Sequence, residues 1–267
     1  MVLANAAALT LPQIWHALRA EASAALVTQP ALAGLLGRQV LTHDSLPVAL
    51  AHRLAQALGQ PDCEAQTLLP LFMERLAQRA ELHQGLARDL QAYRERDPAC
   101  ASWLQPFLFF KGFAAVATQR VAHLLWQEEK PVLAWLLQNR ASELWQVDIH
   151  PAAQLGAGLF IDHATGVVIG ETAVIGADVT IMHGVTLGGN GKERGDRHPK
   201  IGDGVLLSVG AKVLGNIRVG NCARVAGGSV VLRDVPPHVT VAGIPAQAVG
   251  QPTPEQPADC LDHAFTI

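Results

Sequence analysis

The chain is poor in aromatic residues and in cysteine. Aromatic residues make up 5% of its 267 positions, and there is a single tyrosine. Free thiols in a reducing compartment are the simplest account of cysteines that are scattered without a Cys-x-x-Cys spacing, so we expect a cytoplasmic protein. The four cysteines are Cys63, Cys100, Cys222 and Cys260.

Strongly basic segments and long apolar runs are also missing. The formal net charge is −3, and lysine and arginine form no stripe or block. Binding to a nucleic acid or to an anionic membrane would need such a stripe, so neither is expected as a partner. No window approaches about 18 uncharged apolar residues, which argues against a transmembrane helix.

The second half of the chain carries an aliphatic residue at every sixth position, with small or β-branched residues recurring two places earlier. A helix needs apolar spacing near 3.6 and a half-buried strand needs alternation, so a period of six fits neither. It is typical of a left-handed parallel β-helix, in which three such units make one turn and the aliphatic ladder fills the axis. The ladder consists of Ile149, Leu155, Ile161, Ile169, Ile175, Ile181, Leu187, Ile201, Leu207, Val213, Val219, Val225 and Val231.

The ladder is interrupted twice. After Ile161 the next aliphatic residue comes eight positions on instead of six, and residues 188–200 form an excursion rich in glycine and charge. Interruptions of a solenoid are where insertions project, often on the binding face. Both interruptions contain a histidine, His163 in the first and His198 in the second, so chemistry is expected there.

The remaining residues divide into a helical part, which precedes the β-helix, and a tail, which follows it. The predicted fold class is therefore α+β. Residues 1–145 predict an N-terminal all-helical domain, residues 146–250 the β-helix, and residues 251–267, rich in proline and glutamine, a flexible C-terminal tail. Apolar residues at three- and four-residue steps predict helices over 12–25, 46–58, 68–82, 86–94, 107–127 and 132–144.

Two motifs at the interruptions are specific. They read Asp-His-Ala-Thr-Gly over 162–166 and Gly-Asp-Arg-His-Pro-Lys over 195–200, and together with the repeats they resemble serine O-acetyltransferases of the hexapeptide-repeat acyltransferase superfamily. The repeats alone would indicate only the superfamily. One departure is Asn190, where the family has threonine. Other matching segments are 96–98, 111–113, 148–151, 170–173, 185–189 and 236–238.

The resemblance implies transfer of acetyl from acetyl-CoA to the hydroxyl of L-serine, giving O-acetyl-L-serine and CoA in the first step of cysteine biosynthesis, with no permanently bound cofactor and no metal. An alcohol that attacks a thioester needs a base, and a neutral imidazole can serve at cellular pH. By the resemblance, His163 is this base, Asp148 orients its ring, and His198 belongs to the catalytic set. Contact between Asp148 and His163 must come from the fold or from a neighbouring subunit.

The resemblance also assigns binding residues. The ammonium and carboxylate of serine call for acids and a fork-shaped cation, and these map onto Asp97, Asp162 and Arg197. The backbone of Gly189 is expected to donate to the thioester oxygen as it gains charge. Outward cations on later coils are expected to meet the phosphates of CoA, and the two candidates are Lys212 and Arg224.

Three kinds of partner follow from the resemblance. Trimers of the β-helix, with active sites between subunits, are expected to join into a hexamer through the helical domain. L-cysteine is expected as a feedback inhibitor because it keeps both charged groups of serine. The terminal Ile267 is expected to dock in O-acetylserine sulfhydrylase, since an apolar residue with a free carboxylate suits a pocket.

Other readings stay open. Homoserine is a possible acceptor, because one methylene is worth only about 1–3 kcal/mol of discrimination. His163 and His183 lie one coil apart and should stack, which also fits a zinc enzyme of the γ-class carbonic anhydrase type. A non-enzymatic scaffold would lack the acid and base residues, and none of them is missing.

Overall fold

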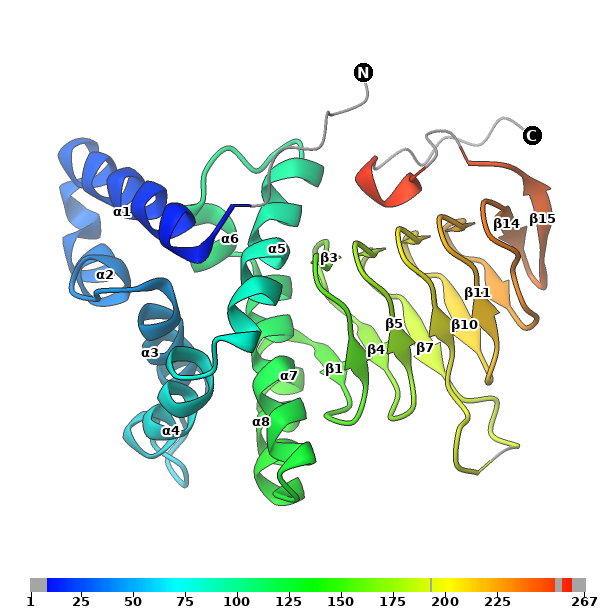
Figure 1. Cartoon of the computed structure of the whole chain (residues 1–267), viewed down its shortest axis with the longest axis horizontal. Coiled ribbons are helices and arrows are strands. Elements are labelled where there is room, and N and C mark those ends of the chain that lie inside the picture. The colour runs from blue at the N-terminus through cyan, green and yellow to red at the C-terminus, as the bar shows by residue number, and fades with distance from the viewer. Residues whose placement is uncertain (1–8, 193, 253–255, 261–267) are drawn as a thin grey trace.

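A computed structural model describes residues 9–192, 194–252 and 256–260. Helices occupy one end of the molecule and a stack of short strands the other (Figure 1). The helices are α1 Leu11–Thr28, α2 Ala33–Leu36, α3 Leu46–Leu58, α4 Ala65–Phe72, α5 Glu81–Arg96, α6 Leu104–Leu108, α7 Lys111–Gln127 and α8 Pro131–Trp145, with short helical turns η1 Pro30–Leu32, η2 Gly37–Leu41, η3 Met73–Ala77 and η4 Pro257–Asp259.

The helix predicted over 107–127 is interrupted. It is divided into α6 and α7, and Phe110 caps α7 with an extended backbone (φ −89°, ψ 108°). The break turns the start of α7 toward the coil, where a Cβ on Gly112 would lie 2.2 Å from the carbonyl oxygen of Ile161. Only glycine permits that approach. The helix predicted over 68–82 is also shorter, because α4 passes into η3 and ends there.

The second half is a parallel β-helix, as predicted, whose strands form three faces. Face 1 contains β1 Val147–Ile149, β4 Val167–Ile169, β7 Thr186–Gly188, β10 Lys212–Leu214 and β13 Val230–Val231. Face 2 contains β2 Gln154–Leu155, β5 Val174–Ile175, β8 Lys200–Ile201 and β11 Arg218–Val219. Face 3 contains β3 Phe160–Ile161, β6 Thr180–Ile181, β9 Leu206–Leu207, β12 Arg224–Val225, β14 Thr240–Gly243 and the antiparallel β15 Ala246–Gly250.

The aliphatic ladder pairs with itself from coil to coil. On face 1, Ile149 pairs with Ile169, which pairs with Leu187, and the register continues through Val213 to Val231. The same alignment holds on faces 2 and 3. These side chains form one buried core along the axis, so the period-six prediction is confirmed.

Helix α5 attaches the helical part to the coil. Its Asp89 is fully buried, pairs with Arg120 of α7 and accepts hydrogen bonds from the backbone N–H groups of Gly158 and Leu159 at 2.9 and 3.0 Å. The helical core also extends to Phe160 of β3. The first coil is therefore packed against α5, which runs beside β3 in Figure 1.

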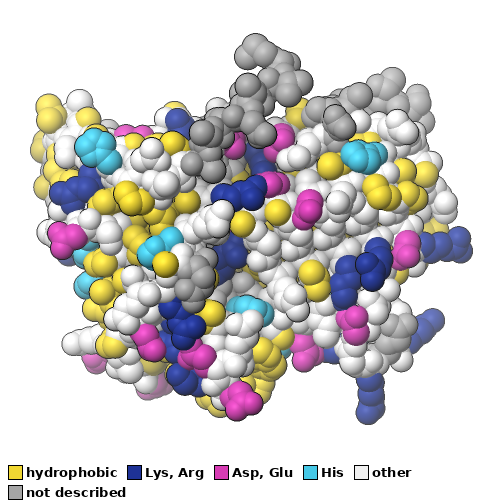
Figure 2. Space-filling model, in the orientation of Figure 1, with side chains coloured by type: hydrophobic (Ala, Val, Ile, Leu, Met, Phe, Trp, Pro, Cys, Tyr) yellow, Lys and Arg dark blue, Asp and Glu magenta, His cyan; other side chains and the backbone are white. Residues whose placement is uncertain are grey.

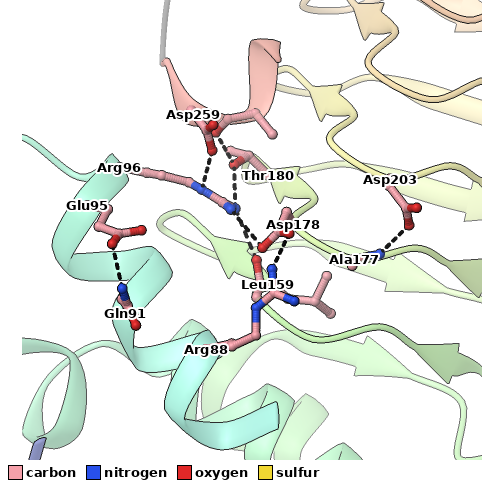
Figure 3. Close-up of polar contacts among 12 residues, drawn as sticks. Arg88, Gln91, Glu95, Arg96, Leu159, Ala177, Asp178, Thr180, Asp203 and Asp259 are labelled. Atoms are coloured by element: carbon pink, nitrogen blue, oxygen red, sulfur yellow. Dashed lines mark hydrogen bonds and ion pairs between the residues drawn. The ribbon is translucent and has the colours of Figure 1, made fainter. Parts of the chain in front are cut away.

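Part of the C-terminal segment, for which the sequence predicts a flexible tail, is described. Residues 256–260 pack against the coil and α5: Ala258 is fully buried, and its carbonyl accepts from the Thr180 hydroxyl at 2.7 Å. Arg96 of α5 lies 3.2 Å from Asp259 (Figure 3). Residues 261–267, including Ile267, lie outside the described residues.

Two surface features bear on membrane helices and on the distribution of charge. None of the described helices has the length and apolar character needed to cross a membrane. On the face drawn in Figure 2, the described acidic and basic side chains are interspersed and form no continuous basic stripe.

Candidate active site

His163 lies on a tight corner between β3 and β4. Residues 162–166, with residues 182–185 one coil on, are called the His163 corner. Both His163 (φ 52°) and Ala164 (φ 57°) have left-handed backbones, and the Ala164 N–H donates to the carbonyl of Asp162 at 2.5 Å. The extra residues of this interruption of the ladder therefore form a compact turn. It leaves the imidazole 74% exposed, where it can reach a substrate.

One carboxylate stands next to this imidazole, and a second carboxylate acts on the first. Oδ2 of Asp162 lies 3.7 Å from Nε2 of His163, and the Asp162 side chain is only 16% exposed. Burial raises the pKa of Asp162, and the neighbouring charge of Asp97, at the end of α5, raises it further, while His163 opposes the rise. Two acids whose charges interact at one corner favour a cation, so this corner suits an ammonium group.

His183 lies beside His163 on the next coil, as the one-coil spacing predicts, and the two rings meet edge to face. The ring centroids are 5.7 Å apart and the planes meet at 77°. Nδ1 of His183 is buried and has no hydrogen-bond partner among the described residues. Across the part of the chain that the structure describes, no group of three histidine, cysteine, aspartate or glutamate residues is placed to hold a metal ion.

Arg197 lies on a different corner, between face 1 and face 2. Residues 170–173 and the described part of 189–199 are called the Arg197 corner. Nη2 of Arg197 lies 2.6 Å from Oε2 of Glu171, and this hydrogen bond lowers the pKa of Glu171. Gly189 runs alongside: a Cβ there would be 3.6 Å from Cγ of Arg197. The glutamate orients the guanidinium and keeps it at the edge of the coil.

His198 is the buried member of this corner. It is 7% exposed and lies over Gly170, where a Cβ would be 2.1 Å from the ring. The backbone N–H of Thr172 donates to Nδ1 at 3.2 Å, and burial lowers the pKa of His198. Because an amide N–H can only donate, Nδ1 holds a lone pair and the proton of the neutral ring is on Nε2. His198 therefore offers a hydrogen-bond donor.

One copy of the chain keeps the two corners apart. The three-residue strand β4 separates them, which at about 3.3 Å per residue is roughly 10 Å. Asp148 is predicted to orient His163, but among the described residues no ion pair joins them. Oδ1 of Asp148 instead accepts from Gln138 of α8 at 2.7 Å. The reason is that Asp148 lies on β1 in the middle of face 1, where it pairs with Val168 of β4, whereas His163 lies on the corner that leads into β4.

The two cations predicted for CoA differ in their surroundings. Lys212 on β10 of face 1 is half-buried, and its ammonium donates to the carbonyl of Gly184 at the His163 corner. Arg224 is 5% exposed on face 3, and its register neighbours Leu206 and Thr240 are buried too. The prediction of an accessible cation at Arg224 is therefore wrong, because the period shows which residues point away from the axis but not which faces the chain covers.

Sequence reasoning missed four side chains that support the two corners. Glu171 and Thr172 hold Arg197 and His198, and both lie inside a segment already matched to the family, so the motif itself was the available signal. Lys111 of α7 donates to the Thr165 hydroxyl. Tyr93 of α5 bonds the backbone of Ile161, and nothing in the local sequence points to that contact.

Known proteins match this chain over nearly its whole length. Residues 14–118 match the family model described as the N-terminal region of serine acetyltransferase. The serine acetyltransferase of Escherichia coli K12 is 46% identical over 94% of this chain and 92% of its own.

Two solved structures are similar in fold as well. Serine acetyltransferase from Brucella abortus in complex with coenzyme A is 51% identical, with a TM-score of 0.88 over 90% of this chain and 96% of that one. A serine acetyltransferase in complex with cysteine is 44% identical, with a TM-score of 0.93 over 96% of this chain and 99% of that one. With identity at this level over most of both chains, and with both corners built from the family's motifs, the chain belongs to the serine acetyltransferase family.

Proposed function

We propose that the chain transfers acetyl from acetyl-CoA to the hydroxyl of L-serine, with His163 as the general base. The observation that carries this proposal is an exposed imidazole on a left-handed turn beside Asp162, a carboxylate that also interacts with the charge of Asp97. A lone pair of the imidazole takes the proton of the serine hydroxyl as its oxygen bonds to the thioester carbon. The tetrahedral intermediate then releases the CoA thiolate, which takes the proton back from the imidazolium.

Serine binding needs both corners. Asp97 and Asp162 receive the ammonium, while Arg197 and Nε2–H of His198 receive the carboxylate. Because roughly 10 Å separates the corners in one copy, the site is complete only when a second copy brings its Arg197 corner against the His163 corner. This requirement supports a trimer, and the family resemblance adds pairing of trimers into a hexamer.

The remaining assignments depend on that assembly. Asp148 polarises an imidazole only if the assembled site brings one to it. The backbone N–H of Gly189, next to Arg197, donates to the thioester oxygen as it gains charge. Lys212 is the remaining cation for the phosphates of CoA, and it must exchange its bond to the Gly184 carbonyl to reach them.

The function is tested by thiol release from acetyl-CoA with serine, homoserine and water as competing acceptors. We expect serine to be used at least about 10-fold better than homoserine, since an extra methylene must displace one of the two charged groups from its partners. Equal use of homoserine would make the enzyme a hydroxyl acetyltransferase of broader range. Release that is independent of any amino acid would contradict the proposal.

Two further proposals concern conditions in the cell. L-cysteine inhibits by occupying the serine site, because it presents the same ammonium and carboxylate with a thiol in place of the hydroxyl; the related structure that holds cysteine supports this. A cytoplasmic location agrees with the supply of acetyl-CoA. It also agrees with the four cysteines, which are scattered along the sequence without a Cys-x-x-Cys spacing.

Ile267 is the proposed docking residue for O-acetylserine sulfhydrylase. Deleting Ile267 alone is expected to abolish co-purification with that enzyme. The deletion removes the apolar side chain and leaves the terminal carboxylate on Thr266, so a pocket that recognises both groups together no longer finds them. Acetyl transfer without cysteine should stay unchanged, which controls for folding. Binding that survives the deletion would show that another surface holds the complex.

A further inference from the structure

Strand β3 is an edge strand, and the catalytic corner follows it directly. The order of face 3 ends in β6 and then β3. The N–H group of Phe160 donates to the carbonyl of Val179, just before β6, at 3.1 Å, and that of Asp162 donates to the carbonyl of Ile181 in β6 at 2.8 Å. The N–H and carbonyl of Ile161 point the other way, because bonding directions alternate along a strand, and no described strand lies on that side.

One side chain supplies both missing bonds. The Tyr93 hydroxyl donates to the Ile161 carbonyl at 3.3 Å and accepts from the Ile161 N–H at 3.2 Å. A phenol can do this because it is donor and acceptor at once. Burial raises the pKa of Tyr93 well above its usual range, so the hydroxyl keeps the proton that it donates.

The position of this hydroxyl is closely determined. The Tyr93 ring is 1% exposed and meets Phe160 edge-on at 4.8 Å and Phe113 at 6.3 Å. A Cβ on Gly112 would lie 2.6 Å from the hydroxyl, so only glycine leaves room for the oxygen. Tyr93 is also the one tyrosine of the whole chain. The packing of Tyr93 on α5 thus places its hydroxyl where it makes the two hydrogen bonds that a neighbouring strand would otherwise make with Ile161.

We propose that Tyr93 is a positioning residue, whose hydroxyl holds Ile161 and thereby sets the placement of Asp162 and His163 for the reaction with serine. This inference rests on the function proposed above. Asp162 and His163 are the next two residues after Ile161, and the left-handed turn that follows has few ways to absorb a shift of its start. Helix α5 also ends at Asp97, so one helix places both acids at the ammonium site.

Tyr93→Phe keeps the ring and removes only the hydroxyl. We expect kcat/KM for serine to fall about 10- to 100-fold, since small misplacements of reacting groups have effects of that size. KM for acetyl-CoA should change less than about 2-fold, because the Tyr93 hydroxyl is bonded to Ile161 and not to Gly189 or Lys212, the residues assigned to CoA. The matched control is Thr118→Val, which removes another buried hydroxyl, bonded at 2.8 Å to the Ala114 carbonyl within α7. That variant should keep normal serine kinetics.

A second measurement uses the unmodified sequence. Protein grown with 3-fluorotyrosine carries a single fluorine label site, at Tyr93. Saturating L-serine should shift the ¹⁹F resonance, while coenzyme A alone should leave it in place. A residue that only stabilises the fold would not respond to serine.

Different results would overturn the proposed function and the positioning role of Tyr93. Lack of serine-dependent thiol release by the unmodified chain would overturn the proposed function. An active unmodified chain together with near-normal serine kinetics in Tyr93→Phe would overturn the positioning role alone. So would losses equal to those of Thr118→Val, or a ¹⁹F resonance that serine does not move.

Discussion

Replacing His163 by alanine is expected to lower the turnover number at least about 100-fold while the protein stays folded, because general-base catalysis is lost. The imidazole is 74% exposed, so its removal empties no core position. Turnover at saturating serine and acetyl-CoA is the measurement, since binding defects are then minimised.

The chain contains a matched control for this variant. His238 is also an exposed histidine with a left-handed backbone, φ 55° against 52° for His163. His238→Ala therefore introduces the same backbone strain without touching the proposed site, and it should turn over normally. A near-normal rate for His163→Ala would remove His163 from the role of base. An equal loss in both variants would assign the effect to strain.

Replacing Asp89 by alanine is expected to destabilise the fold by about 3–5 kcal/mol, the usual cost of leaving one partner of a buried ion pair alone. The Asp89 side chain is fully buried and bonds Nε and Nη2 of Arg120 at 2.8 and 2.9 Å. Its loss also leaves the N–H groups of Gly158 and Leu159 without their acceptor. The packing of α5 against the first coil should weaken most.

The measurement is the denaturant midpoint of the first unfolding transition, followed by circular dichroism. Glu143→Ala is the control, because the Glu143 carboxylate that pairs with Arg140 is half exposed, so water can take its place, and Arg140 keeps its bond to the Leu58 carbonyl. That variant should leave the midpoint unchanged. A midpoint for Asp89→Ala close to the unmodified value would show that the apolar contacts between α5 and the coil hold the junction without the ion pair.

The sequence alone determined the fold of the second half and the two places where its six-residue period breaks. The six-residue period is a local property, since each unit must return one aliphatic side chain to the axis, and the paired ladder from Ile149 to Val231 follows from it. A break in the period forces the chain off the coil. That is why the positions of His163 and Arg197 could be predicted from spacing and motif.

Tertiary structure alone decided how these residues are grouped and supported. Whether two corners face one pocket depends on the path between them, and one copy holds Asp162 and Arg197 apart. Burial of Arg224, the docking of residues 256–260 and the Tyr93 hydroxyl all come from segments far apart in the chain. A repeat shows which side chains leave the axis, but contacts between distant segments decide which are covered, and no local period encodes those contacts.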